Sequence, residues 1–332
     1  MKENNMNLYK SRNISFDFIS AILILYMIFC HVMQWAKLTH TDCYLILQRF
    51  MFFFMAWFFF KSGIYAKVDV NIKKYIVKNA KVLLFPTLLF TIMGLPFVWY
   101  QLYSIDDYNI VHYTLSIAKS FVVGGNLTGN LPLWFLVTLF EVKILYVLMR
   151  RFMGGQIILV MFLIAAYVIY MQDLHRPCYL FSAFTAMTFY AGGKFLAQYM
   201  YSSKLFLISL IIYALSVAFF PQMVDLRTCT LVYGNYALWI FVSISACVTW
   251  NNIVKIAESF LPTIVINMGK NSMNYYVTHW LVLSYTSIVI CKLLGNSLGW
   301  KYFYVQFFTV IVILPFVSYC LNTKYGRKML GR

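Results

Sequence analysis

The chain has 332 residues, of which 62% are hydrophobic, 20% aromatic and only 11% charged. This composition excludes a single soluble domain, because there are too few polar residues to cover a core of that size. Lys and Arg number 27 against 10 Asp and Glu, which gives a formal net charge of +17. We therefore predict an all-α, polytopic integral membrane protein with an excess of basic residues in its loops.

Apolar stretches of about 20 residues recur along the chain, and each matches the hydrocarbon core of a bilayer, about 30 Å thick. We predict about ten transmembrane helices around a polar cavity, forming one domain over residues 1–332 with no appended soluble domain. The predicted spans cover residues 14–35, 44–65, 81–101, 131–149, 156–171, 178–199, 204–221, 229–250, 273–294 and 302–321. The first stretch lacks a small-residue cleavage site, so we expect it to remain as an anchor.

The basic residues predict the orientation of these spans, because Lys and Arg accumulate on cytoplasmic segments. An N-terminus inside places most of them on one side, and an even number of spans then puts both termini in the cytoplasm. The positive charge is thus mainly a topology signal, and we predict no nucleic-acid partner. The run from Lys67 to Lys81 is dense enough to hold an anionic lipid or an anionic ligand.

Residues 16–31, FDFISAILILYMIFCH, place an aspartate and a histidine in the first predicted span. At about 100° per residue, Asp17, Ser20 and His31 share one helix face, with about 20 Å between the first and the last. Ionisable groups inside a membrane are rare unless they have a function. The alternatives are a histidine satisfied by a neighbouring helix and an aspartate hydrated near the interface.

Several other polar or aromatic residues fall within predicted spans. His279 could line the same cavity, and Lys61 is expected to extend to the interface. Glu141 and Lys143 are expected to neutralise partners on facing helices. Trp134 suits an aromatic belt at the membrane surface. The seven cysteines show no CxxC pair and no Cys/His spacing typical of zinc, so no metal is predicted.

Five short motifs, taken together, resemble the membrane-bound acyltransferase family 3, whose members O-acylate bacterial surface polysaccharides and related glycans. The motifs occur in the order expected for that family and cover nearly the whole chain. They are FDFISAILILYMIFCH, FFFKSGIYAK, KKYIVKNAKVLLFP, PLWFLVTLF and MGKNSMNYYVTHW.

The resemblance implies roles for particular residues. His31 would be the essential catalytic residue, with acyl-CoA as the donor substrate. The donor phosphates would lie on basic residues of the first cytoplasmic loop, namely Lys73, Lys74, Lys78 and Lys81. Cavity or substrate positions would be Asp17, Ser20, Trp134, Ser272 and His279.

Two features depart from the family pattern. Many members have an arginine where this chain has Ser20, and an Arg-x-x-Arg pair where it has Lys78 and Lys81. Lysine keeps the positive charge but lacks the planar fork that binds phosphate through two hydrogen bonds.

The resemblance therefore implies an O-acyltransferase, in the first place an O-acetyltransferase, in the cytoplasmic membrane of a bacterium. His31 would act as a general base or form an acyl-histidine, and the sequence leaves both open. Its partners would be acyl-CoA, a glycan or polysaccharide acceptor and the bilayer, with the oligomeric state open. A transporter of a glycan or lipid-linked sugar is the alternative, although Pro86, Pro96 and Pro315 do not mark the paired broken helices of a transporter.

Overall fold

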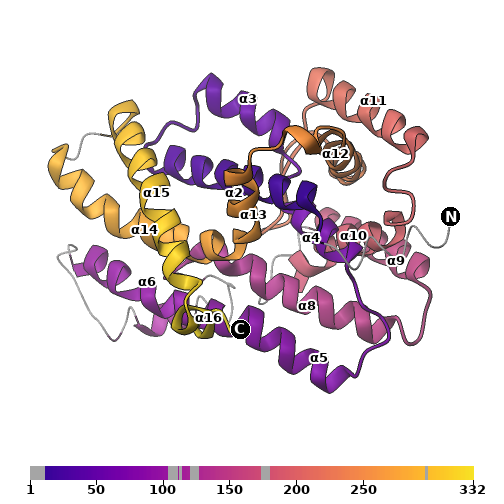
Figure 1. The fold of residues 1–332 in the computed structure, drawn as a ribbon, viewed down its shortest axis with the longest axis horizontal. Coiled ribbons are helices and arrows are strands. Elements are labelled where there is room, and N and C mark those ends of the chain that lie inside the picture. The colour runs from indigo at the N-terminus through magenta and orange to yellow at the C-terminus, as the bar shows by residue number, and fades with distance from the viewer. Residues whose placement is uncertain (1–11, 104–110, 112–113, 120–126, 173–179, 296–297) are drawn as a thin grey trace.

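The computed structural model describes residues 12–103, 111, 114–119, 127–172, 180–295 and 298–332, and within these ranges the protein is mostly helical (Figure 1). The elements are α2 Ile14–Trp35, α3 Asp42–Met51, α4 Phe54–Ile64, α5 Ile72–Asn79, the π-helix η1 Ala80–Leu84, α6 Phe85–Tyr103, the 3₁₀ turn η2 Leu131–Leu133, α8 Trp134–Met149, α9 Gly155–Met171, α10 Leu180–Leu196, α11 Ser203–Phe219, β1 Met223–Asp225, β2 Thr230–Tyr233, α12 Tyr236–Ile256, the 3₁₀ turn η3 Glu258–Phe260, α13 Thr263–Lys270, α14 Ser272–Leu293, α15 Trp300–Leu321 and α16 Lys324–Met329.

Seven helical segments in the described part of the chain are long and apolar enough to cross a membrane. They are Ile14–Trp35, Asp42–Ile64, Ile72–Tyr103, Leu131–Met149, Tyr236–Ile256, Ser272–Leu293 and Trp300–Leu321. The other three predicted spans coincide with α9, α10 and α11, which have 17 residues each and are shorter than these seven. The prediction of a helical, multi-pass membrane protein is confirmed at this level.

Two of the predicted spans differ from the observed elements. The span predicted at 229–250 begins only at Tyr236, because β1 and β2 pair as an antiparallel hairpin just before it. The span predicted at 44–65 is interrupted at Phe52 and Phe53, which separate α3 from α4. Hydropathy alone could not reveal either feature, since β2 and the interruption are themselves mostly apolar.

Helix α2 lies at the centre of the bundle and contacts α12, α13, α14 and α15 (Figure 1). Its side chains are buried along most of its length, and its N-terminus is capped by Asn13, whose side chain accepts a hydrogen bond from the Phe16 amide at 3.1 Å. A polar side chain on α2 is therefore surrounded by other helices rather than by lipid.

Helices α4 and α10 pack with their backbones in close contact. A Cβ atom on Gly63 would lie 1.9 Å from the Tyr190 carbonyl oxygen, and one on Gly193 would lie 2.1 Å from the Phe60 carbonyl oxygen. Small residues of this kind allow membrane helices to approach closely. The same contact fixes α4, whose first residues line the cavity described below.

Candidate functional site

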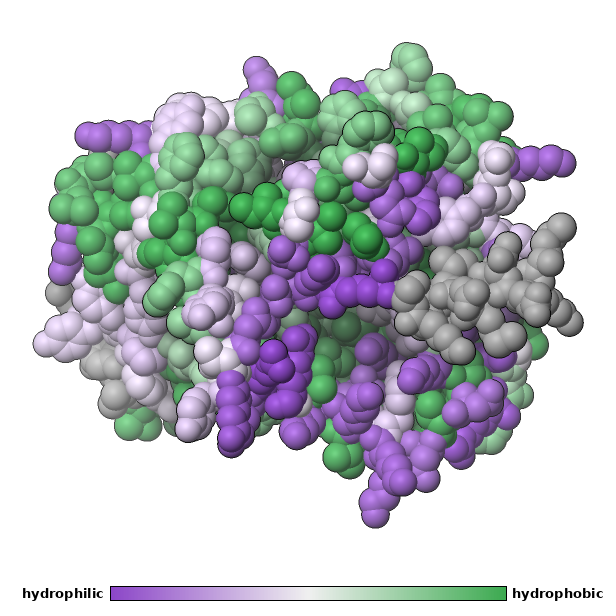
Figure 2. Space-filling model, in the orientation of Figure 1, coloured by the Kyte–Doolittle hydropathy of each residue, from purple (hydrophilic) through white to green (hydrophobic). Residues whose placement is uncertain are grey.

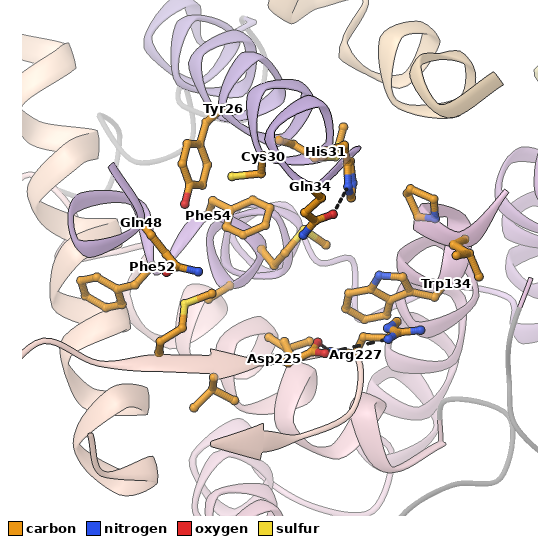
Figure 3. A pocket seen from close by; sticks show the side chains of 18 of the residues that line it. Tyr26, Cys30, His31, Gln34, Gln48, Phe52, Phe54, Trp134, Asp225 and Arg227 are labelled. Carbon is orange, nitrogen blue, oxygen red and sulfur yellow. Dashed lines mark hydrogen bonds and ion pairs between the residues drawn. The ribbon is translucent and has the colours of Figure 1, made fainter. Parts of the chain in front are cut away.

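A cavity of about 350 Å³ lies between α2, the α3–α4 segment, the hairpin, the start of α8 and α14 (Figure 3). This volume is in the range of small-molecule sites. Polar groups on its walls include Tyr26, His31, Gln34, Gln48, Asp225 and Arg227. Apolar and aromatic side chains form most of the remainder, so ligand atoms inside would be largely shielded from water.

His31 lies in the wall of this cavity, half-buried near the C-terminal end of α2. Its Nδ1 is 3.1 Å from the Oε1 of Gln34, one helical turn further on (Figure 3). A carbonyl oxygen can only accept, so Nδ1 carries the proton in this arrangement and Nε2 presents a lone pair. Gln34 thus holds the imidazole in the form that can accept a proton from a ligand.

His279 stacks against His31, with ring centroids 5.4 Å apart and planes inclined by 18°. The side chain is buried, and its Nδ1 lies 2.7 Å from the carbonyl oxygen of Tyr276, to which it must donate. Its Nε2 is buried without a hydrogen-bond partner among the described residues. Helices α2 and α14 therefore bring the two histidines together, although His279 does not itself line the cavity.

Aromatic rings enclose this pair. The Trp280 ring packs edge to face on the His31 ring, with the ring centroids 5.2 Å apart. The Trp35 ring packs on that of Trp280, with the centroids 5.7 Å apart. Trp134 is only 8% exposed and lines the cavity, so the expectation that it belongs to an interfacial belt is wrong. The hydroxyl of Tyr276 donates to the Pro132 carbonyl, which ties α14 to the segment that carries Trp134.

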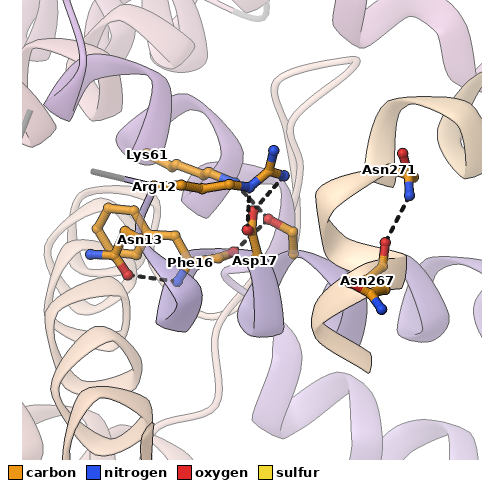
Figure 4. A network of polar contacts seen from close by, with 8 residues as sticks. Arg12, Asn13, Phe16, Asp17, Lys61, Asn267 and Asn271 are labelled. Carbon is orange, nitrogen blue, oxygen red and sulfur yellow. Dashed lines mark hydrogen bonds and ion pairs between the residues drawn. The ribbon is translucent and has the colours of Figure 1, made fainter. Parts of the chain in front are cut away.

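Asp17 lies at the opposite end of α2, and the fourteen residues between it and His31 correspond to about 21 Å. Its carboxylate accepts two hydrogen bonds from Arg12, at 2.5 and 3.1 Å (Figure 4). The Asp17 side chain is 7% exposed, whereas that of Arg12 is 56% exposed. The observed partner is therefore Arg12 rather than a loop lysine, and an organising role for Asp17 stays a prediction.

Ser20 and Lys61 extend this polar network into the bundle. The Ser20 hydroxyl donates to the Phe16 carbonyl at 2.6 Å, and the Lys61 ammonium donates to the Ser20 oxygen at 2.6 Å. The ammonium also lies 5.2 Å from the centre of the Trp57 ring. The expectation that Lys61 extends to the interface is therefore wrong, since its charge is held against α2 (Figure 4).

The predicted phosphate-binding lysines are exposed on one continuous segment, α5 and η1. Figure 2 shows hydrophilic residues gathered where α5 and α16 lie in Figure 1. The Lys81 carbonyl approaches Gly331, which adopts φ +68°, and so the C-terminus packs on η1. Burial lowers the pKa of Arg332, and the nearby charges of Arg12 and Arg327 lower it further.

These contacts extend the basic region beyond the predicted lysines. We call it the basic face, and its members are Arg12, Lys73, Lys74, Lys78, Lys81, Lys324, Arg327, Lys328 and Arg332. Sequence reasoning counted the C-terminal residues only as topology signals. Nothing in their spacing indicates that α16 folds back beside η1, and their contribution could not be foreseen.

Ser272 begins α14 and is half-buried. Seven residues, or about 10 Å of helix, separate it from His279, and it does not line the cavity. The structure thus separates Ser272 from the other residues predicted to serve the acceptor site.

The charged residues of α8 do not form the pairs expected from the sequence. Lys143 donates to the Asn79 side-chain oxygen at 3.3 Å rather than to a carboxylate. Glu141 has a buried carboxylate oxygen, Oε2, without a hydrogen-bond partner in the described part of the chain. Neither residue lines the cavity.

Within the described ranges, no three His, Cys, Asp or Glu side chains lie close enough together to hold a metal ion. The polar cavity residues that sequence reasoning missed include Tyr26, Gln34, Gln48, Asp225 and Arg227. Comparisons with protein-family models, curated proteins and solved structures find no significant match for this chain.

Proposed function

We propose that the protein is a membrane-embedded O-acyltransferase, in the first place an O-acetyltransferase, that transfers an acyl group from acyl-CoA to a hydroxyl of a glycan. The observation that carries the proposal is the placement of His31. Its ring lines an aromatic cavity, its Nδ1 is held by Gln34, and its Nε2 presents a lone pair. This arrangement suits removal of a proton from a bound hydroxyl.

The proposed reaction has two steps at the thioester carbon. His31 Nε2 takes the hydroxyl proton as the acceptor oxygen forms a bond to the carbonyl carbon. The tetrahedral intermediate then expels the thiolate of CoA, which takes the proton from the imidazolium. The ester and CoA are the products, and the imidazole returns to its starting form. Transient acylation of His31 is the second route that the same geometry allows.

The basic face supports the choice of acyl-CoA as donor. CoA carries several phosphate charges, and clustered Lys and Arg side chains attract such a group. Arg12 of the basic face bonds Asp17 at one end of α2, and Asp17 is about 21 Å along the helix from His31. The proposal therefore requires the pantetheine arm of the donor to extend through the bundle beside α2.

The same face supports a cytoplasmic location for this end of the molecule. Arg12, just before α2, lies close enough to Arg332 for its charge to lower the pKa of Arg332. We propose that both termini lie in the cytoplasm, where Lys and Arg accumulate, and that the protein resides in a bacterial cytoplasmic membrane. The cavity at His31 would then face the outer side, where the glycan is supplied.

Transport of a glycan or lipid-linked sugar is the second candidate. The observation that favours it is the break at Phe52 and Phe53, because broken helices line the substrate sites of many transporters. A transporter moves its substrate unchanged and cleaves no thioester.

Release of CoA distinguishes the two functions. Purified protein in lipid nanodiscs is mixed with acetyl-CoA and an acceptor glycan, and the free thiol of CoA is measured over time. We expect thiol release with wild type and a loss of at least about a hundredfold with His31→Ala. The matched control is His40→Ala, since His40 is exposed in the loop after α2. Equal rates for wild type and His31→Ala would contradict the proposal.

A further inference from the structure

The hairpin of β1 and β2 forms the wall of the cavity that faces His31. Asp225 and Arg227 extend from it toward the space below His31 and Gln34, and Trp134 lies beside Arg227 (Figure 3). Neither charged residue takes part in the reaction steps described above. They are 40% and 33% exposed, so both side chains are accessible to a ligand.

Hydrogen bonds hold the Asp225 side chain and the backbone of Arg227 in place. Asp225 Oδ1 accepts from the Arg227 amide at 3.0 Å, and the Arg227 carbonyl accepts from the Ser182 hydroxyl of α10 at 2.6 Å. The base of the hairpin is closed by Gln222, whose Oε1 accepts from the Asn235 amide at 2.6 Å. A site built on such a fixed turn can orient a ligand without a large ordering cost.

The charge of the cavity favours a neutral ligand. Among the described residues that line it, Asp225 and Arg227 supply one formal charge of each sign. Their closest charged atoms, Oδ2 and Nη2, are 4.0 Å apart, which is longer than a hydrogen bond. A ligand hydroxyl can therefore meet the carboxylate and the guanidinium together. A phosphate would meet no net positive charge here, in contrast to the basic face.

The remaining walls combine flat aromatic surfaces with amide groups. Tyr26, Tyr44, Trp134, Tyr276 and Trp280 line the cavity together with Gln34 and Gln48. A pyranose ring has C–H groups that pack on aromatic faces and hydroxyls that bond to carboxylate, guanidinium and amide groups. The cavity offers both kinds of contact on different walls, as specific small-molecule sites do.

We infer that this cavity binds a neutral sugar ring, with Asp225 and Arg227 hydrogen-bonding its hydroxyls across from His31. The inference rests on the proposed function, since it assigns the acceptor site of that reaction. It makes Asp225 and Arg227 specificity-determining residues: they select a neutral, hydroxyl-rich ring and turn one hydroxyl toward the Nε2 of His31.

Equilibrium binding in the absence of acyl-CoA tests the inference. Purified protein in nanodiscs is titrated with the methyl glycosides of glucose, galactose and N-acetylglucosamine, and with glucuronate as a charged counterpart. Trp134, Trp239 and Trp280 line the cavity, so occupancy should change the intrinsic fluorescence. We expect saturable binding of at least one neutral glycoside and weaker binding of glucuronate.

Two variants locate the binding to the hairpin. Asp225→Asn keeps the Oδ1 acceptor for the Arg227 amide and removes only the charge, so the turn should stay folded. We expect at least a tenfold loss of affinity in Asp225→Asn and, independently, in Arg227→Gln. Asp42→Asn and Arg151→Gln change exposed residues outside the cavity and should bind as wild type does. No saturable binding, or unchanged affinity in both hairpin variants, would overturn the inference.

The acceptor site and the reaction can fail separately in these measurements. Glycoside binding that depends on Asp225, in a protein that never releases CoA, would support the sugar site and reject the transferase. Thiol release with an acceptor KM that Asp225→Asn leaves unchanged would reject the sugar site and leave the transferase standing.

Discussion

His31 and His279 stack with their ring centroids 5.4 Å apart, although they come from α2 and α14, which are far apart in the sequence. Each donates its Nδ1 proton to a fixed carbonyl oxygen, of Gln34 and of Tyr276 respectively. The two imidazoles therefore present their Nε2 atoms as acceptors within one aromatic enclosure. His31 lines the cavity directly, whereas His279 lies behind it.

His279 should therefore act on the position of His31 rather than on the substrate. We expect His279→Asn to lower kcat about ten- to a hundredfold with little change in the KM of either substrate, because a displaced base still meets bound substrate. Steady-state kinetics of the purified protein measure this, with His40→Asn as control. A large rise in either KM without a change in kcat would assign His279 to substrate binding.

The lysines of the basic face should determine donor affinity. Lys78→Gln together with Lys81→Gln should raise the KM for acetyl-CoA about tenfold and leave kcat nearly unchanged, because the lysines are far from the reacting atoms. The effect should shrink at high salt, which screens exposed charges. Lys301→Gln is the matched control. Lys301 lies near the opposite end of α2, because the amide of the neighbouring Gly299 donates a hydrogen bond to the Ala36 carbonyl.

A second donor separates phosphate binding from a general electrostatic effect. When 3′-dephospho-acetyl-CoA replaces acetyl-CoA, the wild type should lose more affinity for the donor than the double lysine variant does. Equal losses in the two proteins would mean that these lysines do not contact that phosphate.

The pair of Arg12 and Asp17 should stabilise the start of α2. Charged hydrogen bonds of this kind contribute about 1.5–3 kcal/mol to the free energy of unfolding. The solvent exposure of Arg12 reduces this contribution. Asp17→Asn should therefore lower the thermal unfolding temperature in detergent. The double variant Arg12→Gln with Asp17→Asn should be hardly less stable than the single one, because both changes remove the same contact. Additive losses would show that Asp17 acts through other groups, such as Lys61.

The close approach of α4 and α10 predicts a steric effect at Gly63. Gly63→Ala would place a methyl group 1.9 Å from the Tyr190 carbonyl oxygen, so the two helices must separate. We expect a large fall in unfolding temperature and in yield of folded protein. Gly154→Ala is the control, since no atom lies within 4 Å of the added Cβ. Equal stability of the two variants would contradict the packing described for these helices.

Cys229 offers a pH-dependent test of the hairpin. Burial raises the pKa of its thiol to about 11, so the reactive thiolate appears only at high pH. In variants that retain a single cysteine, iodoacetamide should label Cys229 slowly from pH 7 to 9, whereas the exposed Cys43 should react readily. Rapid labelling of Cys229 at pH 8 in the folded protein would mean that the hairpin is not packed as described.

The sequence predicted those parts of the structure that depend on local pattern. The span at 14–35 coincides with α2, because a long apolar run begins after the capping residue Asn13. The shared face of Asp17, Ser20 and His31 follows from helical periodicity alone.

The features that the sequence did not reveal depend on long-range packing. Strand β2 falls within a predicted apolar span, and only the packing of the hairpin around the cavity shows that Asp225 and Arg227 lie across from His31. The burial of Trp134 and the hydrogen bond from Lys61 to Ser20 likewise depend on which helices become neighbours. Periodicity carries no information about such contacts.

Catalysis at His31 is tested most directly by the transfer of label from radiolabelled acetyl-CoA to surface glycan, in membranes with equal amounts of wild type or His31→Ala. We expect label in the glycan with wild type, none above background with His31→Ala, and normal labelling with the control His40→Ala. Equal labelling by wild type and His31→Ala would contradict catalysis at His31, and absence of label in wild type would contradict the acetyltransferase itself.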